Sequence, residues 1–200
     1  MNLTFGICTT QPRPDRLAEV IASIDALNIP QYEVMIMDGP EWITTKKNAV
    51  ALHAKYDTLV LLHDYFVFDP GWYQAYEAFG YEWDVCSNPQ MMIDGKRHFT
   101  DWVIWDHPIY PRYYSLPYGN LTFTKFQYQS GGYMLVKRNF LQAEPLNGSY
   151  VSGQPEDVEW SLRMRNRAVY TCNPHAIVRH NKVHRDCGRP GFPFRQEGHP

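Results

Sequence analysis

The chain has 200 residues, 44% of them hydrophobic, which fits one globular domain and excludes a disordered or fibrous protein. The formal net charge of −2 gives no electrostatic reason to expect nucleic acid or an anionic membrane as a partner. No stretch approaches the roughly 20 apolar residues of a membrane span, so none is predicted. Aromatic residues are plentiful, with 14 Tyr and 6 Trp. Such side chains are typical of sugar-binding sites, and equally of a Tyr-rich core and surface.

The four cysteines, at positions 8, 86, 172 and 187, are scattered and form no C-x-x-C pair. They do not make a disulfide framework, which favours a reducing compartment. The N-terminal segment MNLTFGICTT has neither a basic leader nor a long apolar run, so no signal peptide is expected. We therefore predict that the chain is cytoplasmic, or that it is a soluble piece of a longer protein.

The first half of the chain alternates short apolar runs with amphipathic segments. The predicted elements are a strand at 3–8, a helix capped by Asp15 and running to Leu27, a strand at 32–37, a helix from Thr44 or Thr45 to Ala54, a strand at 58–62 and a helix starting at Asp69-Pro70. This alternation indicates an α/β fold, with a mostly parallel sheet flanked by helices. Ligands of such sheets bind beyond the carboxyl ends of the strands, where Thr9, Asp38 and His63-Asp64 stand.

The segment 83–129 is rich in Trp, Tyr, Pro and Asp and has weak periodicity. A long irregular stretch inside a compact domain is typically a binding loop or lid. Within 101–118, Trp105 and Asp106 are the leading candidates for contacts with a sugar. An aromatic mini-core beneath a loop is the alternative. The aromatic residues of this stretch also include Trp102, Tyr110 and Tyr113.

The last third of the chain regains order. Gly131-Gly132 precedes a predicted strand at 133–137, and 168–180 indicates one or two strands. Pro155 predicts the start of a helix of about three turns. Val158 and Leu162 lie four residues apart, so we expect both to pack inward from that helix.

Three clusters of acidic and imidazole side chains could carry chemistry. They are His63-Asp64-Tyr65 with Asp69, the pair Glu156-Asp157, and His175, His180 and His184. Carboxylate oxygens and imidazole nitrogens together suit Mn²⁺, Mg²⁺ or Zn²⁺. Simpler readings stay open: carboxylates in a first helical turn complement the helix dipole, and neighbouring histidines can be an exposed basic tail.

The order of these segments resembles that of the family 2 glycosyltransferases, over about residues 3–185. The similar segments are LTFGICTTQPRPDRLAEVIASI, KKNAVALHAKYD, YDTLVLLHDYFVFDPGWY, SGGYMLVKRNFL and GQPEDVEWSLRMR. The tail IVRHNKVHRD is similar to the metal-ligand segment of the β-1,4-galactosyltransferases. The resemblance implies a single GT-A-type domain. Its Rossmann-like half, about 1–85, would bind the nucleotide-sugar, and about 86–200 would bind the acceptor and catalyse.

The resemblance also implies roles for individual residues. The donor nucleotide would contact Thr9, Asp38, Lys47, Asn48, His63 and Asp64, and Asp64 and His180 would hold Mn²⁺ or Mg²⁺. Asp157 matches the catalytic base, with Glu156 beside it to bind the acceptor or orient the loop. Gly131, Gly132, Trp105 and Asp106 would face the acceptor.

One departure concerns the metal motif, which reads His63-Asp64-Tyr65 and holds a single carboxylate. Diphosphate oxygens would supply further metal ligands once the donor binds. The implied function is metal-dependent transfer of a sugar from a nucleotide-diphosphate donor, a UDP-sugar by resemblance, to a carbohydrate or glycoconjugate acceptor, with inversion.

Other functions stay open at this point. A nucleotidyltransferase or a retaining transferase of the same fold would not need the base, although CTTQPRPD lacks a Gly-rich phosphate loop. A zinc hydrolase could use the histidine clusters, but no H-E-x-x-H helix is present. A non-catalytic carbohydrate-binding protein is the third alternative.

Overall fold

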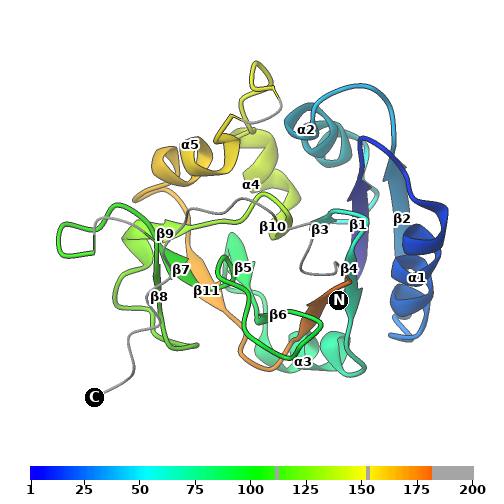
Figure 1. Ribbon diagram of the computed structural model, residues 1–200, viewed down its shortest axis with the longest axis horizontal. Helices are drawn as coiled ribbons and strands as arrows, with labels where there is room; N and C mark the ends of the chain where they lie inside the picture. Colours follow the sequence, from blue (N-terminus) through cyan, green and yellow to red (C-terminus); the bar gives the residue numbers. More distant parts are fainter. Residues whose placement is uncertain (111–112, 152–153, 182–200) are drawn as a thin grey trace.

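The computed structural model describes residues 1–110, 113–151 and 154–181 (Figure 1). Its helices are α1 (Pro14–Asp25), α2 (Ile43–His53), α3 (Trp72–Phe79), α4 (Arg138–Ala143) and α5 (Glu156–Arg163), with a 3-10 turn η1 (Thr124–Phe126). Its strands are β1 (Leu3–Cys8), β2 (Tyr32–Met37), β3 (Thr58–Leu62), β4 (Phe66–Phe68), β5 (Val85–Ser87), β6 (Gln90–Met91), β7 (Val103–Ile104), β8 (Tyr114–Ser115), β9 (Gln127–Tyr128), β10 (Tyr133–Lys137), β11 (Tyr170–Cys172) and β12 (Val178–His180). Within the described ranges, no helix is long and apolar enough to cross a membrane.

The central sheet has six strands in the order β11-β5-β10-β3-β1-β2. β1 pairs in parallel with both β2 and β3, β11 pairs in parallel with β5, and only β10 runs antiparallel to its neighbours. The predicted mostly parallel α/β sheet is therefore confirmed. Strands from both ends of the chain contribute to it, which brings the α5 region to the same sheet as β1.

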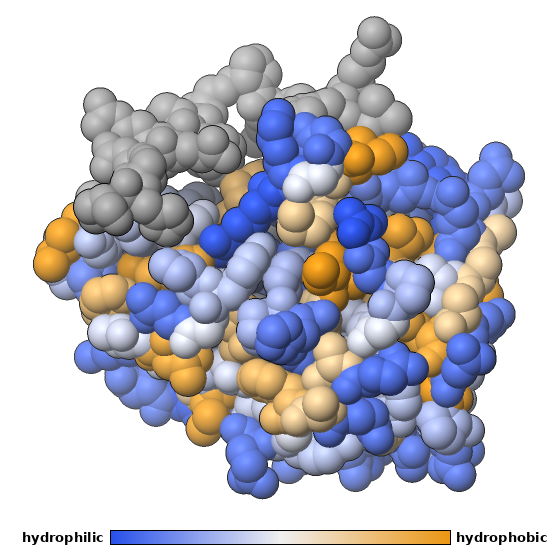
Figure 2. Space-filling view, turned by 90° about the horizontal axis from the view of Figure 1, so that it is seen from below, coloured by the Kyte–Doolittle hydropathy of each residue, from blue (hydrophilic) through white to orange (hydrophobic). Residues whose placement is uncertain are grey.

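Two core clusters lie on opposite faces of this sheet, because successive strand side chains point to opposite sides. Val60 and Leu62 pack with α1 and α3, whereas Leu59 and Leu61 pack with α2, α4 and α5. Figure 1 shows α1 and α2 at different sides of the β1–β2 edge. On the face seen in Figure 2, hydrophobic side chains are scattered among hydrophilic ones, as is ordinary for a globular surface.

Helix starts differ from the sequence predictions by one to three residues. No side-chain cap forms at α1, where Arg13 is the N-cap residue and Asp15 lies in the first turn. Helix α2 begins before Thr44, and α3 begins only at Trp72, after a left-handed Gly71. The Asp69 carboxylate is instead held by Arg179 at 2.5 and 2.6 Å, so it does not cap that helix. Helix α5 has 8 residues, about two turns rather than three.

The segment predicted to be irregular contains five short strands, β5 to β9. β7, β8 and β9 form a small antiparallel sheet, and β6 joins β12 and β4 in another. Trp102 is fully buried in the core cluster that also holds Trp160. The sequence did not predict these strands within the irregular stretch, because strands of two or three residues are too short to show a period of two.

Candidate functional site

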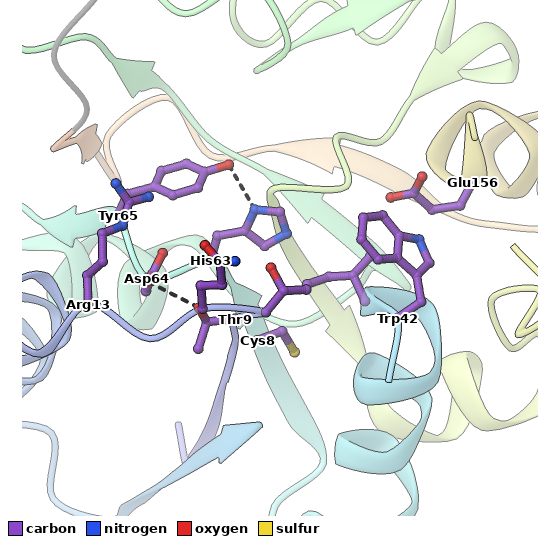
Figure 3. Close-up of a pocket in the computed structure, with 11 residues that line it drawn as sticks. Cys8, Thr9, Arg13, Trp42, His63, Asp64, Tyr65 and Glu156 are labelled. Atoms are coloured by element: carbon purple, nitrogen blue, oxygen red, sulfur yellow. Dashed lines mark hydrogen bonds between the residues drawn. The ribbon is translucent and has the colours of Figure 1, made fainter. Parts of the chain in front are cut away.

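A cavity of about 410 Å³ opens at the carboxyl ends of β1 and β3 (Figure 3). This is the edge at which ligands of parallel sheets bind, and the volume lies in the range of small-molecule sites. Ten of its lining residues come from the first third of the chain, and the eleventh comes from the start of α5. They are Cys8, Thr9, Thr10, Gln11, Arg13, Trp42, Ile43, His63, Asp64, Tyr65 and Glu156. The cavity thus unites Thr9, His63 and Asp64 with Glu156, four residues that the sequence predicted for one site.

Asp64 is buried at the start of the turn after β3. The Thr9 hydroxyl donates to its Oδ2 at 3.2 Å, and the Lys46 ammonium donates to the Thr9 carbonyl at 2.6 Å. Lys46 is itself buried, so it contributes a positive charge beneath this end of the cavity. A positive charge in a poorly solvated site favours the binding of an anionic ligand nearby.

His63 and Tyr65 stand on either side of Asp64, and His63 Nδ1 lies 2.8 Å from the Tyr65 hydroxyl. His180 ends β12, opposite Phe66 in the β4–β12 ladder, two residues beyond Asp64. Its ring is buried and stacks on that of His98, with ring centroids 4.0 Å apart. The topology therefore places His180 on the strand that pairs with β4, and Asp64 lies in the turn directly before β4.

A carboxylate and an imidazole are donor types that Mn²⁺ accepts, so the chemistry of this pair fits the expected metal. Two protein ligands are fewer than such an ion takes. Within residues 1–110, 113–151 and 154–181, no group of three or more His, Cys, Asp or Glu side chains could hold a metal. His184 lies outside the described residues. Any metal here would need further ligands from the substrate.

Glu156 and Asp157 begin α5 but face different surroundings. The Asp157 carboxylate accepts from the Tyr128 hydroxyl, from Gly131 N–H at 3.1 Å and from Val158 N–H at 2.9 Å. Glu156, in contrast, lines the cavity, and Figure 3 shows its carboxylate pointing into it. Burial raises the pKa of Glu156, and the neighbouring Asp157 charge raises it further.

Lys47 is fully buried, and its ammonium donates to the carbonyl of Gly131. Burial lowers the pKa of Lys47, while Cys8, Glu156 and Asp157 oppose that shift. The Gly131 backbone lies tightly below the acidic pair: a Cβ at this position would meet Glu156 Oε1 at 3.1 Å and Asp157 Oδ2 at 3.2 Å. Lys47 therefore fixes the Gly131 segment, which contacts both acids, and it lies outside the described lining of the cavity, where its predicted contact with the nucleotide is not supported.

Other predicted site residues lie around the cavity. Gly132 accepts from His63 N–H at 3.1 Å and so adjoins the cavity wall. Asp38 is exposed after β2, outside the described lining. Asn48 bonds both of its amide groups to the backbone of Leu146, at 2.8 and 3.0 Å. Its predicted contact with the nucleotide is therefore not supported, because the side chain ties α2 to the segment before α5.

Trp105 and Asp106 lie on the α5 side of the site. The Trp105 ring packs on Tyr113 at 4.5 Å, and Tyr113 packs on Tyr128, the residue that donates to Asp157. Asp106 is exposed and lies 3.4 Å from Arg165. These aromatic rings form a continuous row that ends at Asp157.

Sequence reasoning missed Arg13, Trp42 and Tyr128. Arg13 and Trp42 each precede the first residue of a helix that follows a parallel strand, so their position past the strand end was an available signal. Tyr128 had none, since only the pairing of β9 with β7 and its contact with α5 bring it to Asp157.

No protein-family model matches the chain, and no curated protein shows significant sequence similarity to it. Solved structures do match. A mutant of Drosophila β-1,4-galactosyltransferase 7, in complex with manganese, UDP-Gal and xylobiose, has a TM-score of 0.61 at 13% identity, covering 98% of this chain and 77% of the other. A fragment of S. aureus TarS with UDP-GlcNAc has a TM-score of 0.63 at 10% identity, covering 92% and 60%. A197 from STIV has a TM-score of 0.55 at 13% identity, covering 90% and 84%.

At such identities, these likenesses establish the fold and no more. The chain has the GT-A fold of the glycosyltransferases, as the order of its motifs predicted. Its candidate site lies at the carboxyl ends of β1 and β3.

Proposed function

We propose that the chain is a metal-dependent glycosyltransferase that moves a sugar from a UDP-sugar to a hydroxyl of a glycan or other acceptor. The observation that carries this proposal is the cavity that joins Thr9 and Asp64, at the strand ends, to Glu156 at the start of α5. The UDP-Gal and manganese of the Drosophila structure, and the UDP-GlcNAc of the TarS structure, support the choice of donor.

Asp64 and His180 would hold Mn²⁺ or Mg²⁺, with the donor diphosphate completing the coordination. The bound ion would stabilise the negative charge that grows on the leaving diphosphate. The residues of the chain would position that diphosphate. Thr9 orients the Asp64 carboxylate, while the charges of Lys46 and Arg13 favour an anion at this end.

Asp157 would act as general base. An acceptor hydroxyl is a poor nucleophile, so its proton must pass to a carboxylate as its oxygen bonds to the anomeric carbon. The bond from that carbon to the diphosphate oxygen breaks on the opposite side, which inverts the configuration. Tyr128, Gly131 and the Val158 N–H at the start of α5 fix the orientation of the Asp157 carboxylate.

The acceptor would approach along the row of aromatic rings that ends at Asp157. Trp105 offers a face for sugar C–H groups, and Asp106 offers an exposed carboxylate for hydroxyls. Gly131 and Gly132 would border the same opening, because their backbone adjoins both acids and His63.

The proposal is tested by titrating the chain with UDP in the calorimeter, with and without Mn²⁺, and by following UDP release from UDP-sugars in the presence of free sugars and glycosides. Binding of UDP that Mn²⁺ strengthens, together with acceptor-dependent release of UDP, is expected. Release of pyrophosphate from UTP and a sugar 1-phosphate, without UDP release, would instead identify a nucleotidyltransferase.

A further inference from the structure

One end of the cavity combines an aromatic ring with a carboxylate. Trp42 is the N-cap residue of α2, and Glu156 is the first residue of α5. Both line the cavity, and Figure 3 shows them toward the same end, away from Asp64 and Arg13. These two residues have no part in the metal site or in proton transfer as proposed above.

The place of Asp157 decides which part of the donor lies at this end. If Asp157 takes the proton of the attacking hydroxyl, the anomeric carbon must lie within a few ångströms of it. Asp157 adjoins Glu156 in α5, and both acids lie against Gly131. The diphosphate belongs at the opposite end, with Asp64 and Arg13. The transferred sugar then extends toward Glu156, and the nucleoside extends the other way.

The two side chains suit a sugar. An aromatic face packs on the C–H groups of a pyranose, and a carboxylate accepts hydrogen bonds from its hydroxyls. The half-buried carboxylate of Glu156 accepts no hydrogen bond from another side chain in the part of the chain that the structure describes. Apart from the bond from its own backbone N–H, its hydrogen-bonding capacity is available to a ligand in the cavity, whereas that of Asp157 is largely used by Tyr128, Gly131 and Val158.

We propose that Trp42 and Glu156 form the subsite for the transferred sugar of the donor. This inference rests on the proposed function, and it gives Glu156 the donor sugar as ligand rather than the acceptor. It also makes the α2 N-terminus a determinant of which UDP-sugar is used, because Trp42 shapes the wall against which the sugar packs.

The test compares UDP with UDP-glucose, UDP-galactose and UDP-N-acetylglucosamine by calorimetry in the presence of Mn²⁺. The variants are Trp42→Ala, Trp42→Phe and Glu156→Gln. Glu159→Gln is the matched control, since Glu159 lies on the same helix, pairs with Arg163 and lies outside the described lining. The measured quantity is the affinity for the preferred UDP-sugar divided by that for UDP.

We expect this ratio to fall about tenfold in Glu156→Gln and about fivefold in Trp42→Ala, with affinity for UDP changed less than about twofold. Trp42→Phe should keep most of the ratio, and Glu159→Gln all of it. An unchanged ratio in Glu156→Gln would overturn the subsite. In that case, binding of UDP would still support the proposed function. Equal losses for UDP and UDP-sugar in Trp42→Ala would place the nucleoside on Trp42 and also overturn it. Failure of the wild type to bind UDP would remove the proposed function, and the subsite with it.

Discussion

Replacing Asp157 by Asn tests the proposed base and separates its catalytic role from its structural one. The carboxylate accepts from Tyr128 O–H and Gly131 N–H on Oδ2 and from Val158 N–H on Oδ1. An amide has one acceptor oxygen, so either orientation turns its NH₂ toward at least one backbone N–H. The Tyr128 hydroxyl can rotate to adapt, but the backbone donors cannot.

One unsatisfied, partly buried donor costs about 1–3 kcal/mol. For a chain of this length the Tm should fall by roughly 2–12 °C. Domains commonly have a free energy of unfolding of about 5–15 kcal/mol, so the variant stays folded at 25 °C. Loss of the general base should lower turnover on the order of 10²–10⁴-fold. That decrease is far larger than partial unfolding could produce.

The assay measures acceptor-dependent UDP release and UDP affinity on the same preparation, with Glu159→Gln as control. We expect nearly unchanged UDP affinity, because the diphosphate lies at the Asp64 end of the cavity, and a product of inverted anomeric configuration by NMR. Turnover close to that of the wild type, or a product of retained configuration, would refute the reasoning and leave Asp157 as a residue that only orders the α5 N-terminus.

Three further changes test the rest of the site. Mn²⁺ should strengthen UDP binding in calorimetry, and Asp64→Ala should reduce this increase in UDP affinity by at least about tenfold. UDP binding that does not depend on Mn²⁺ and is unchanged in Asp64→Ala would argue against the metal site. Trp105→Ala should raise the acceptor KM about fivefold with little change in Tm, whereas unfolding of the variant would favour the aromatic mini-core. Because the pKa of Glu156 is raised in the fold, its native state holds the proton more tightly, and the ionised form destabilises the protein above that pKa. Glu156→Gln should therefore raise the Tm at pH 7, and the gain should vanish below the unfolded-state pKa; a lower Tm at pH 7 would contradict this.

The sequence predicted the first three strands and the two helices between them, because each is long enough for its periodicity to show. β1, β2 and β3 have the predicted bounds, and their ends carry the polar residues Thr9 and Asp64 that line the cavity. The order of the motifs predicted His180, in the last third of the chain, as a partner of Asp64, and the β4–β12 ladder brings it to the strand that follows Asp64.

Side-chain orientation on α5 was beyond the reach of the sequence. Leu162, predicted to face inward with Val158, is 39% exposed, while Trp160 is fully buried. A spacing of four shows which residues share a helix face, but not which face meets the core. The same uncertainty applies to Glu156 and Asp157, of which only Glu156 lines the cavity.

What the sequence by itself determined is therefore the α/β order, the strand-end candidates and the acidic pair, since these depend on local pattern. Tertiary structure alone decided that Lys47 lies buried under Gly131, that Tyr128 holds Asp157, and that Trp42 and Glu156 line the same cavity. These contacts join residues about 30 to more than 100 positions apart in the chain. No local periodicity encodes them, because they follow from the order in which the strands pair and from the packing of α2 and α5 beside the same sheet.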